Sequence, residues 1–199
     1  MEGNILDTIK LITGAKGAPS ISKVDTGTHD LYTVLFNDGI IEPNVYFNFI
    51  ALLDRLQKGS RVIVLINSPG GYVTSGRAVI AAMKRCKGEI ITVNLGIAAS
   101  CGAMIWSEGH KRYMAKHAQL MYHTASQWES GKSRDIRDNT ENTETHLDIW
   151  FKSYVDKGLI TQTEYDKVFR KRSDLFLLST DMRGRDGVYI LGDDNATTI

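Results

Sequence analysis

The chain has 199 residues, of which 42% are hydrophobic and 24% are charged, and its 24 Lys and Arg against 23 Asp and Glu give a formal net charge of +1. These proportions are those of an ordinary globular chain. They exclude an intrinsically disordered protein, a collagen-like repeat and a disulfide-rich scaffold. The balanced charge gives no reason to expect a large basic surface, and we predict no nucleic-acid partner. A chain of this length can bury one complete core, so we expect a single domain.

The cysteines and the hydrophobic pattern bear on metal, redox and membrane chemistry. Cys86 and Cys101 are too few for a disulfide framework and lack the spacing of a zinc or redox motif. We therefore predict no metal, no cofactor and a cytoplasmic location. Residues 90–107 form an uncharged stretch that just reaches the length of a membrane span. Polar residues dilute it and a glycine divides it, so we predict a buried strand followed by a buried helix, and no membrane partner.

Apolar periodicity predicts the elements of the first half of the chain. The first thirty residues show little periodicity, and we expect a mobile N-terminal arm over residues 1–30 with one short helix near residues 5–11. Beyond the arm, strands and helices alternate. The expected elements are a strand at 31–36, a helix from 43 to 59, a strand at 61–67, a helix that ends at 87–88, a strand at 90–95 and a short helix at 98–107.

The second half of the chain continues the pattern with shorter strands and longer helices. Two short strands are expected near 113 and at 120–122, and a long polar helix at about 134–156. A capping-box pattern at 161–164 starts a further helix. This alternation is typical of an α/β fold with a largely parallel sheet, and we treat residues 31–199 as one domain. In such sheets, ligands bind near the carboxyl ends of the strands.

The loop NSPGG at residues 67–71 leaves a predicted buried strand and enters a helix. Two consecutive glycines leave backbone N–H groups uncovered, and such donors can bind a developing oxyanion. A tight strand-to-helix turn without a ligand explains the same letters equally well.

Ser100 follows the next buried strand and stands among alanine and glycine residues. Its hydroxyl would be uncrowded and the following N–H would be free for an oxyanion, as at a nucleophile elbow. A helix N-cap is the simpler interpretation of this serine alone. The glycine loop one βα unit upstream favours the nucleophile, because neighbouring strand ends lie close together. Cys101 is an alternative nucleophile, but we expect its side chain to be packed in the core.

A nucleophilic serine needs a base, and His123 stands out among the five histidines because it ends a short apolar run. A structural histidine is the alternative. Asp174 is a weakly indicated orienting carboxylate, since it precedes the apolar run 175–178, where an ionised group needs a partner. Lys111 or Lys116 could instead serve a Ser–Lys dyad, although their loop of clustered charges is typical of a solvated segment.

Four motifs, in this order, resemble those of the ClpP family, the proteolytic subunit of the Clp protease. They are INSPGG at 66–71 with VTSG at 73–76, AASCGA at 98–103, MYHTA at 121–125 and SDLFLLST at 173–180. The resemblance covers roughly residues 31–191. The chain departs from the family's pattern at Cys101, where methionine is usual, at Thr124 and Ala125, where Gln-Pro is usual, and at Ser173, where arginine often precedes the aspartate.

The resemblance implies a role for each candidate residue. Ser100 would be the nucleophile, His123 the general base and acid, and Asp174 the group that orients the imidazole. The N–H groups of Gly70 and Cys101 would form the oxyanion hole. An extended peptide would bind by main-chain hydrogen bonds along Gly71, Tyr72, Val73, Thr124, Ala125 and Ser126.

The implied fold is ClpP/crotonase-like, with a largely parallel sheet, repeated βα units and a projecting handle helix at about 134–156. The implied assembly is a homo-oligomeric tetradecamer of two stacked heptameric rings, which an AAA+ unfoldase feeds with unfolded protein. We favour a serine endopeptidase inside such a barrel. The alternatives are a catalytically inactive ring subunit, a phage capsid-maturation protease and a crotonase-like acyl-CoA enzyme.

Overall fold

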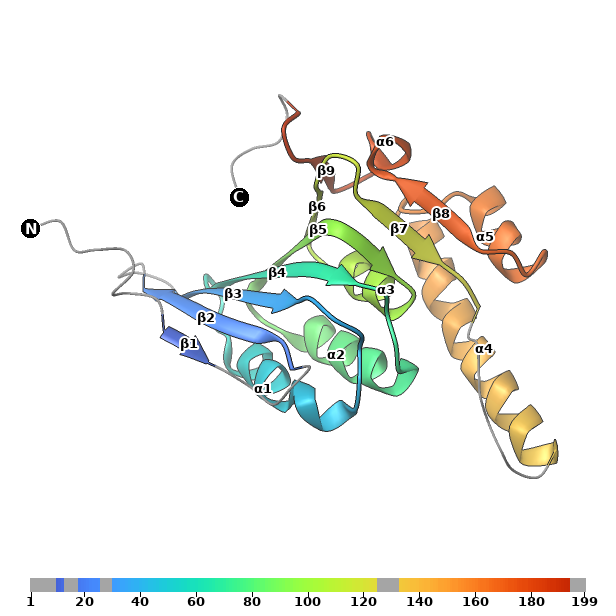
Figure 1. Ribbon diagram of the computed structural model, residues 1–199, viewed down its shortest axis with the longest axis horizontal. Helices are drawn as coiled ribbons and strands as arrows, with labels where there is room; N and C mark the ends of the chain where they lie inside the picture. The colour runs from blue at the N-terminus through green and yellow to red at the C-terminus, as the bar shows by residue number, and fades with distance from the viewer. Residues whose placement is uncertain (1–9, 13–17, 26–29, 125–132, 194–199) are drawn as a thin grey trace, which may run out of the picture.

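The computed structural model describes residues 10–12, 18–25, 30–124 and 133–193 (Figure 1). The elements of these residues, in chain order, are β1 (Lys10–Ile12), β2 (Ser20–Asp25), β3 (Asp30–Phe36), the 3-10 helix η2 (Pro43–Tyr46), α1 (Phe47–Arg55), β4 (Arg61–Ser68), α2 (Val73–Arg85), β5 (Glu89–Ala99), α3 (Cys101–Ser107), β6 (Lys111–Met114), β7 (Gln119–Tyr122), α4 (Ser133–Asp156), α5 (Gln162–Phe169), β8 (Leu175–Leu178), α6 (Ser179–Met182) and β9 (Val188–Ile190).

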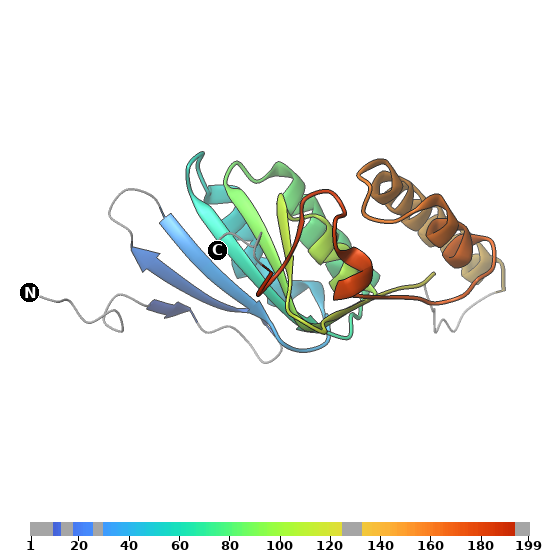
Figure 2. The same cartoon turned by 90° about the horizontal axis from the view of Figure 1, so that it is seen from above.

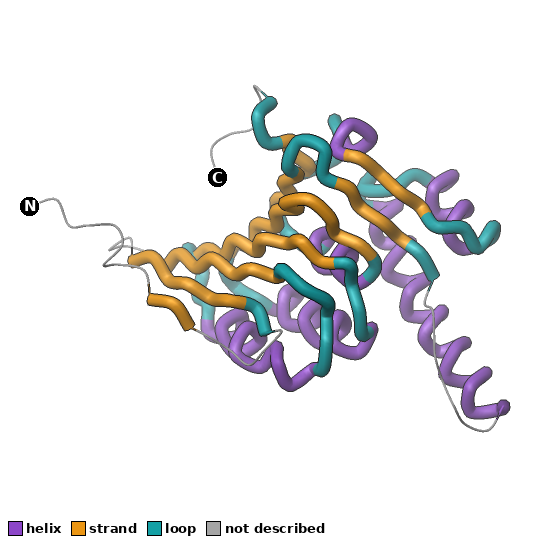
Figure 3. Tube along the Cα trace, viewed as in Figure 1, coloured by secondary structure: helices purple, strands orange, loops and turns teal. Residues whose placement is uncertain are grey.

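The strands form one mixed sheet (Figures 1 and 3), and most of its strand pairs are parallel. The order of its main path is β1-β2-β3-β4-β5-β6-β9. Along this path, neighbouring strands from β3 onwards are parallel, whereas β1 with β2 and β2 with β3 are antiparallel pairs. β7 pairs in parallel with the end of β5, and β8 pairs antiparallel with β7. The predicted α/β fold with a largely parallel sheet is therefore confirmed.

β5 is longer than predicted and changes partners along its length. Its first residues pair with β4 and β6, the register with β4 shifts between Ile66 and Ser68, and residues 97–99 then pair with β7. The prediction of a helix from residue 98 was wrong, because pairing with β7 keeps residues 97–99 extended. The helix α3 begins instead at Cys101.

Helices α1, α2 and α3 cover one face of the sheet (Figures 1 and 2). In α2, the spacing of Val79, Ile80 and Met83 places these side chains on one buried stripe, which packs into the main core. Trp106 of α3 is fully buried in the same core. A smaller apolar cluster, formed by Ile91, Val93 and Tyr113, is separate from this core.

The predicted long helix is present as α4, which projects beyond the sheet (Figure 1). Near its C-terminal end, Leu147, Phe151 and Tyr154 are buried, and the Phe151 ring packs edge-on against Tyr122 at 5.5 Å between ring centroids. The exposed side chains at 137–139 belong to the projecting part. None of the helices in the described part of the chain is both long and apolar enough to span a membrane.

The N-terminal segment differs from the prediction of an arm over residues 1–30 with a helix near 5–11. Residues 10–12 and 20–25 are strands β1 and β2, and β2 pairs with β3 along its whole length. Short polar strands carry a weak local signal, since their stability comes from the neighbouring strand. Residues 1–9 lie outside the described residues.

The predicted capping box at 161–164 is confirmed at the start of α5. The hydroxyl of Thr161 accepts the Glu164 N–H at 3.2 Å, and the Glu164 carboxylate accepts the Thr161 N–H at 2.7 Å. Burial by itself raises the pKa of Glu164. Hydrogen bonds from Arg185 and from the Thr161 N–H outweigh that effect and lower the pKa.

Candidate active site

The structure brings the hydroxyl of Ser100 and the imidazole of His123 together. Ser100 Oγ lies 2.8 Å from His123 Nε2, a hydrogen-bonding distance. Ser100 lies at the junction of β5 and α3, and His123 directly follows β7, which pairs with the end of β5. The N–H of Ser100 also donates to the carbonyl of Met121 at 2.8 Å. The two side chains thus come from adjacent strand ends.

The backbone of Ser100 has an unusual conformation, with φ 52° and ψ −122°. Few residues other than glycine adopt such angles, and strained positions of this kind occur often at active sites. The hydroxyl makes no capping hydrogen bond to α3. The N-cap interpretation of this serine is therefore wrong, and the geometry matches a nucleophile elbow.

The glycine loop lies directly against this serine. A Cβ atom added to Gly70 would stand 2.6 Å from Ser100 Cβ, 2.5 Å from the Ala99 carbonyl oxygen and 3.1 Å from the Cys101 nitrogen. Gly70 also has a φ of +92°, which favours glycine. A side chain at this position would push the loop away from the serine, so the sequence needs glycine here.

The N–H of Gly70, predicted as an oxyanion donor, already has another acceptor. It donates to Ser68 Oγ at 3.2 Å. The structure thus differs from the expectation of a free donor at Gly70, and the reason is the serine two residues upstream. Sequence reasoning missed Ser68, although a serine two residues before a turn glycine is a known signal for this hydrogen bond.

The N–H of the next residue, Gly71, faces the Cys101 side of the loop. The backbone groups on both sides of Gly71 are hydrogen-bonded to Ile40. The Ile40 N–H donates to the Gly70 carbonyl at 2.7 Å, and the Ile40 carbonyl accepts the Tyr72 N–H at 2.8 Å. In an extended strand, the N–H and carbonyl of one residue point to the same side. The Gly71 carbonyl accepts the Cys101 thiol at 3.4 Å, so the Gly71 N–H points to that side as well.

Cys101 is buried, as predicted, with 1% of its surface exposed. Burial raises the pKa of its thiol to about 11. A thiol with that pKa remains protonated near neutral pH and is a poor nucleophile. As the first residue of α3, Cys101 has no acceptor within the helix for its own N–H, so this donor is available beside Ser100.

Asp174 is exposed and lies just before β8. The β7–β8 ladder pairs Tyr122 with Leu175 and ends there, which makes His123 and Asp174 the next residues on the two strands. Among the described residues, no hydrogen bond joins the Asp174 carboxylate to the imidazole. The structure therefore places this carboxylate on the strand opposite the histidine without completing a triad.

Two other candidate bases, Lys111 and His110, are engaged elsewhere. Lys111 pairs with Glu89 at 2.9 Å, and this contact raises the pKa of the lysine. His110 Nδ1 accepts the Ile90 N–H at 2.8 Å. The Ser–Lys dyad through Lys111 is therefore absent from the structure, whereas Lys116 is exposed on a turn.

The predicted peptide-binding residues divide into three groups. Tyr72 is exposed, but its N–H donates to the Ile40 carbonyl. Val73 is the first residue of α2. These two residues therefore do not offer a free strand edge to a peptide. Thr124 directly follows His123, and the Gly71 carbonyl accepts the thiol of Cys101, the residue next to Ser100. Ala125 and Ser126 lie outside the described residues.

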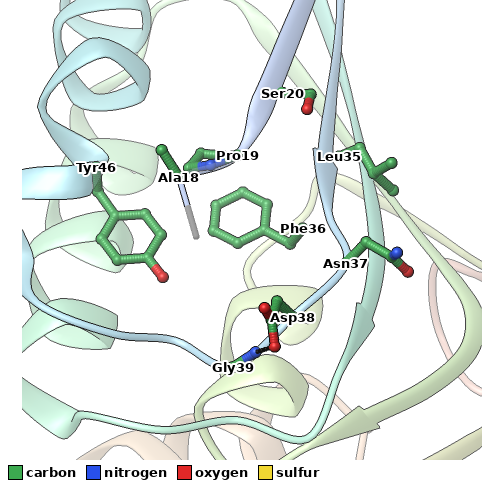
Figure 4. Close-up of a pocket in the computed structure, with 9 residues that line it drawn as sticks. All are labelled: Ala18, Pro19, Ser20, Leu35, Phe36, Asn37, Asp38, Gly39 and Tyr46. Atoms are coloured by element: carbon green, nitrogen blue, oxygen red, sulfur yellow. Dashed lines mark hydrogen bonds between the residues drawn. The ribbon is translucent and has the colours of Figure 1, made fainter. Parts of the chain in front are cut away.

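A pocket of about 230 Å³ lies between residues 18–20 and the end of β3 (Figure 4). The turn at 37–39 lines it, together with Phe36 and Tyr46. Neither Ser100 nor His123 lines this pocket, so it is not where the hydroxyl and the imidazole meet.

Comparison with known proteins identifies the family. Residues 33–179 match the family model of the Clp protease. The chain is 37% identical over 89 residues to the ATP-dependent Clp protease proteolytic subunit 3, chloroplastic, of Arabidopsis thaliana, a match that covers 44% of the chain and 29% of that protein. It is 40% identical over 78 residues to proteolytic subunit 2 of Bifidobacterium longum, covering 38% of each.

A third relative, the ATP-dependent Clp protease proteolytic subunit of Streptococcus mutans, is 36% identical over 107 residues, which cover 48% of the chain and 55% of the relative. The chain thus spans 29% to 55% of the length of these curated relatives. The family match extends over most of the chain and includes Ser100 and His123. This chain belongs to the Clp protease family.

Proposed function

We propose that the chain is a serine endopeptidase that acts through Ser100 and His123. The observation that carries this proposal is the 2.8 Å distance between Ser100 Oγ and His123 Nε2. A hydroxyl at this distance from a neutral imidazole can lose its proton to Nε2 as its oxygen attacks a peptide carbonyl carbon. The protonated imidazole then gives this proton to the leaving amine, and the acyl group stays on the serine oxygen.

The second half of the reaction uses the same groups. His123 takes a proton from a water molecule, whose oxygen attacks the acyl carbon, and Ser100 leaves with that proton as a free hydroxyl. In both halves, negative charge develops on the former carbonyl oxygen. The N–H groups of Gly71 and Cys101 are the donors that we assign to this oxyanion, in place of Gly70.

Asp174 is the carboxylate that we assign to orient His123. The β7–β8 register supports this role, because it places the two residues opposite each other. A carboxylate at the other ring nitrogen selects the imidazole tautomer that can accept the serine proton.

The proposal includes the assembly and partners of the family. The relatives' names describe proteolytic subunits of an ATP-dependent protease. We expect a cytoplasmic homo-oligomer of two stacked heptameric rings, in which α4 is the handle between rings, and an AAA+ unfoldase as the source of unfolded substrate. The projection of α4 beyond the sheet supports this part of the proposal (Figure 1).

A fluorophosphonate probe and a fluorogenic peptide test the nucleophile. The wild-type protein should be labelled and should cleave the peptide, whereas Ser100→Ala should do neither. Ser153→Ala is the matched control, since Ser153 lies on α4 and its hydroxyl donates to the Trp150 carbonyl at 2.7 Å. Cleavage by Ser100→Ala would refute the assignment.

An inactive ring subunit is the second candidate function, and the missing hydrogen bond between Asp174 and His123 favours it. Such a subunit would assemble into rings without cleaving peptides. Native mass measurement on the purified protein, followed by the peptide assay on the same sample, separates the two. Homomeric rings that cleave the peptide exclude the inactive subunit.

A further inference from the structure

Ser68 is a fully buried serine with two backbone partners. It is the last residue of β4, and its hydroxyl accepts the Gly70 N–H at 3.2 Å and donates to the Asp38 carbonyl at 2.7 Å. A hydroxyl has one proton. Because that proton goes to the Asp38 carbonyl, a lone pair of the oxygen faces the Gly70 N–H.

The packing around Ser68 leaves its side chain little freedom. A Cβ atom added to Gly102 of α3 would stand 3.4 Å from Ser68 Cβ and 3.7 Å from Ser68 Oγ. The serine is thus enclosed by the turn at 37–39, the glycine loop and the first turn of α3. The same turn at 37–39 lines the pocket of Figure 4, where the Gly39 N–H donates to the Asp38 carboxylate at 2.7 Å.

Two consecutive peptide planes on either side of Gly70 are each held by a hydrogen bond. The plane that contains the Gly70 N–H is held by Ser68, and the next plane is held by Ile40, whose N–H donates to the Gly70 carbonyl at 2.7 Å. This second plane carries the N–H of Gly71. Glycines restrict their own dihedral angles less than any other residue, so the direction of this N–H depends on such external bonds.

We propose that Ser68 is a positioning residue that aims the Gly71 N–H at the oxyanion. This inference rests on the proposed function, because it assumes that Ser100 attacks a peptide carbonyl. Oxyanion donors work because they are held in place before the charge develops, and a looser support weakens them. Ser68 touches no substrate atom in this scheme and acts only through the loop.

The test compares Ser68→Ala with Ser75→Ala. Ser75 is a matched control because it is also fully buried, and its hydroxyl donates to the Ile41 carbonyl on the same connection, but it holds no N–H of the glycine loop. Ser68→Ala should lower kcat for peptide cleavage by about ten- to hundredfold, with KM within about twofold of the wild type. Ser75→Ala should keep kcat within about threefold.

A tetrahedral inhibitor gives a second measurement of the same effect. A peptide boronic acid forms an adduct that places an oxygen in the oxyanion site, so its affinity should fall in Ser68→Ala by the same factor as kcat. If Ser68→Ala does not fold, Ser68→Cys keeps a side chain of similar size with a weaker acceptor, and it should show a smaller loss in the same direction.

The outcomes separate this inference from the proposed function. A wild-type protein that cleaves the peptide, together with an unchanged kcat in Ser68→Ala, overturns the role of Ser68 alone. Equal losses of kcat in Ser68→Ala and Ser75→Ala also overturn it, since they indicate a general structural effect. A wild-type protein that neither takes the probe nor cleaves the peptide refutes the proposed function and this role with it.

Discussion

His123 and Asp174 are opposite residues at the open end of one antiparallel ladder, one step beyond the pair Tyr122 and Leu175. The histidine already reaches Ser100, whereas the aspartate is exposed. In an antiparallel pair, opposite side chains lie on the same face of the sheet. The register therefore favours an Asp174 carboxylate on the same face of the sheet as the imidazole.

The first prediction concerns this carboxylate. Asp174→Asn should lower kcat for peptide cleavage by about 10²- to 10⁴-fold, because an amide no longer favours the productive tautomer of His123. Asp156→Asn is the control, since Asp156 is exposed at the end of α4, and it should keep the wild-type kcat. An Asp174→Asn variant with wild-type kcat would show that another group orients the histidine.

The second prediction concerns the contact of Gly70 with the serine. Gly70→Ala should abolish cleavage and reduce the free energy of unfolding by about 3 kcal/mol, because the new Cβ meets Ser100 Cβ at 2.6 Å and the Ala99 carbonyl oxygen at 2.5 Å. Urea unfolding and the peptide assay measure the two effects.

Gly184→Ala is the control that separates the steric cost of the new Cβ from the cost of a positive φ at a residue other than glycine. Gly184 has a φ of +80°, close to the +92° of Gly70, but an added Cβ would meet no atom within 4 Å. This variant should lose about 1 kcal/mol of unfolding free energy and keep its activity. An equal loss of unfolding free energy in Gly70→Ala and Gly184→Ala would contradict a steric contribution from the contact with Ser100.

The third prediction concerns the strained backbone of Ser100. Ser100→Gly and Ser100→Ala both lack the hydroxyl and should both be inactive. The glycine variant should be more stable than the alanine variant by about 1 kcal/mol, because glycine adopts a φ of 52° with ψ −122° without strain. Urea unfolding of the two variants measures this difference, and an equal stability would show that the conformation is not strained.

The fourth prediction concerns stability at high pH. Burial raises the pKa of the Cys101 thiol from 9.0 to about 11, so the folded state holds this proton more tightly than the unfolded state. The resulting stabilisation is complete below pH 9 and is lost as the pH rises from 9 to about 11. This loss should amount to about 3 kcal/mol of unfolding free energy.

Cys101→Ala removes the thiol but keeps the backbone N–H. Its unfolding free energy should fall less steeply between pH 9 and 11 than that of the wild type. A remaining slope above pH 10 is expected from Tyr122, whose pKa burial raises to about 12. Identical slopes in the two proteins would contradict the assignment of the effect to Cys101.

The sequence could predict those features whose signal is local. The β-branched run of β4, the stripe of α2 and the capping box at Thr161 each depend on residues close together in the chain. The pairing of Ser100 with His123 was predicted from the resemblance to the ClpP family, since the residues around His123 left its role open.

The features that sequence reasoning missed depend on partners far along the chain. β5 continues to Ala99 because β7 pairs with it, and β2 is a strand because β3 lies beside it. The choice between Gly70 and Gly71 as the donor depends on the directions of two peptide planes. One of these is set by Ile40, some thirty residues upstream, so the letters of the loop alone could not decide it.

The hydrogen bond from the Ser100 N–H to the Met121 carbonyl joins the main chain of Ser100 to β7, the strand that ends next to His123. Such a bond does not depend on which side chain occupies residue 121. A substitution at residue 121 should therefore not change the distance between the Ser100 hydroxyl and the His123 imidazole. Half-buried Met121 can therefore be exchanged for another side chain while the Ser100 hydroxyl and the His123 imidazole stay within hydrogen-bonding distance.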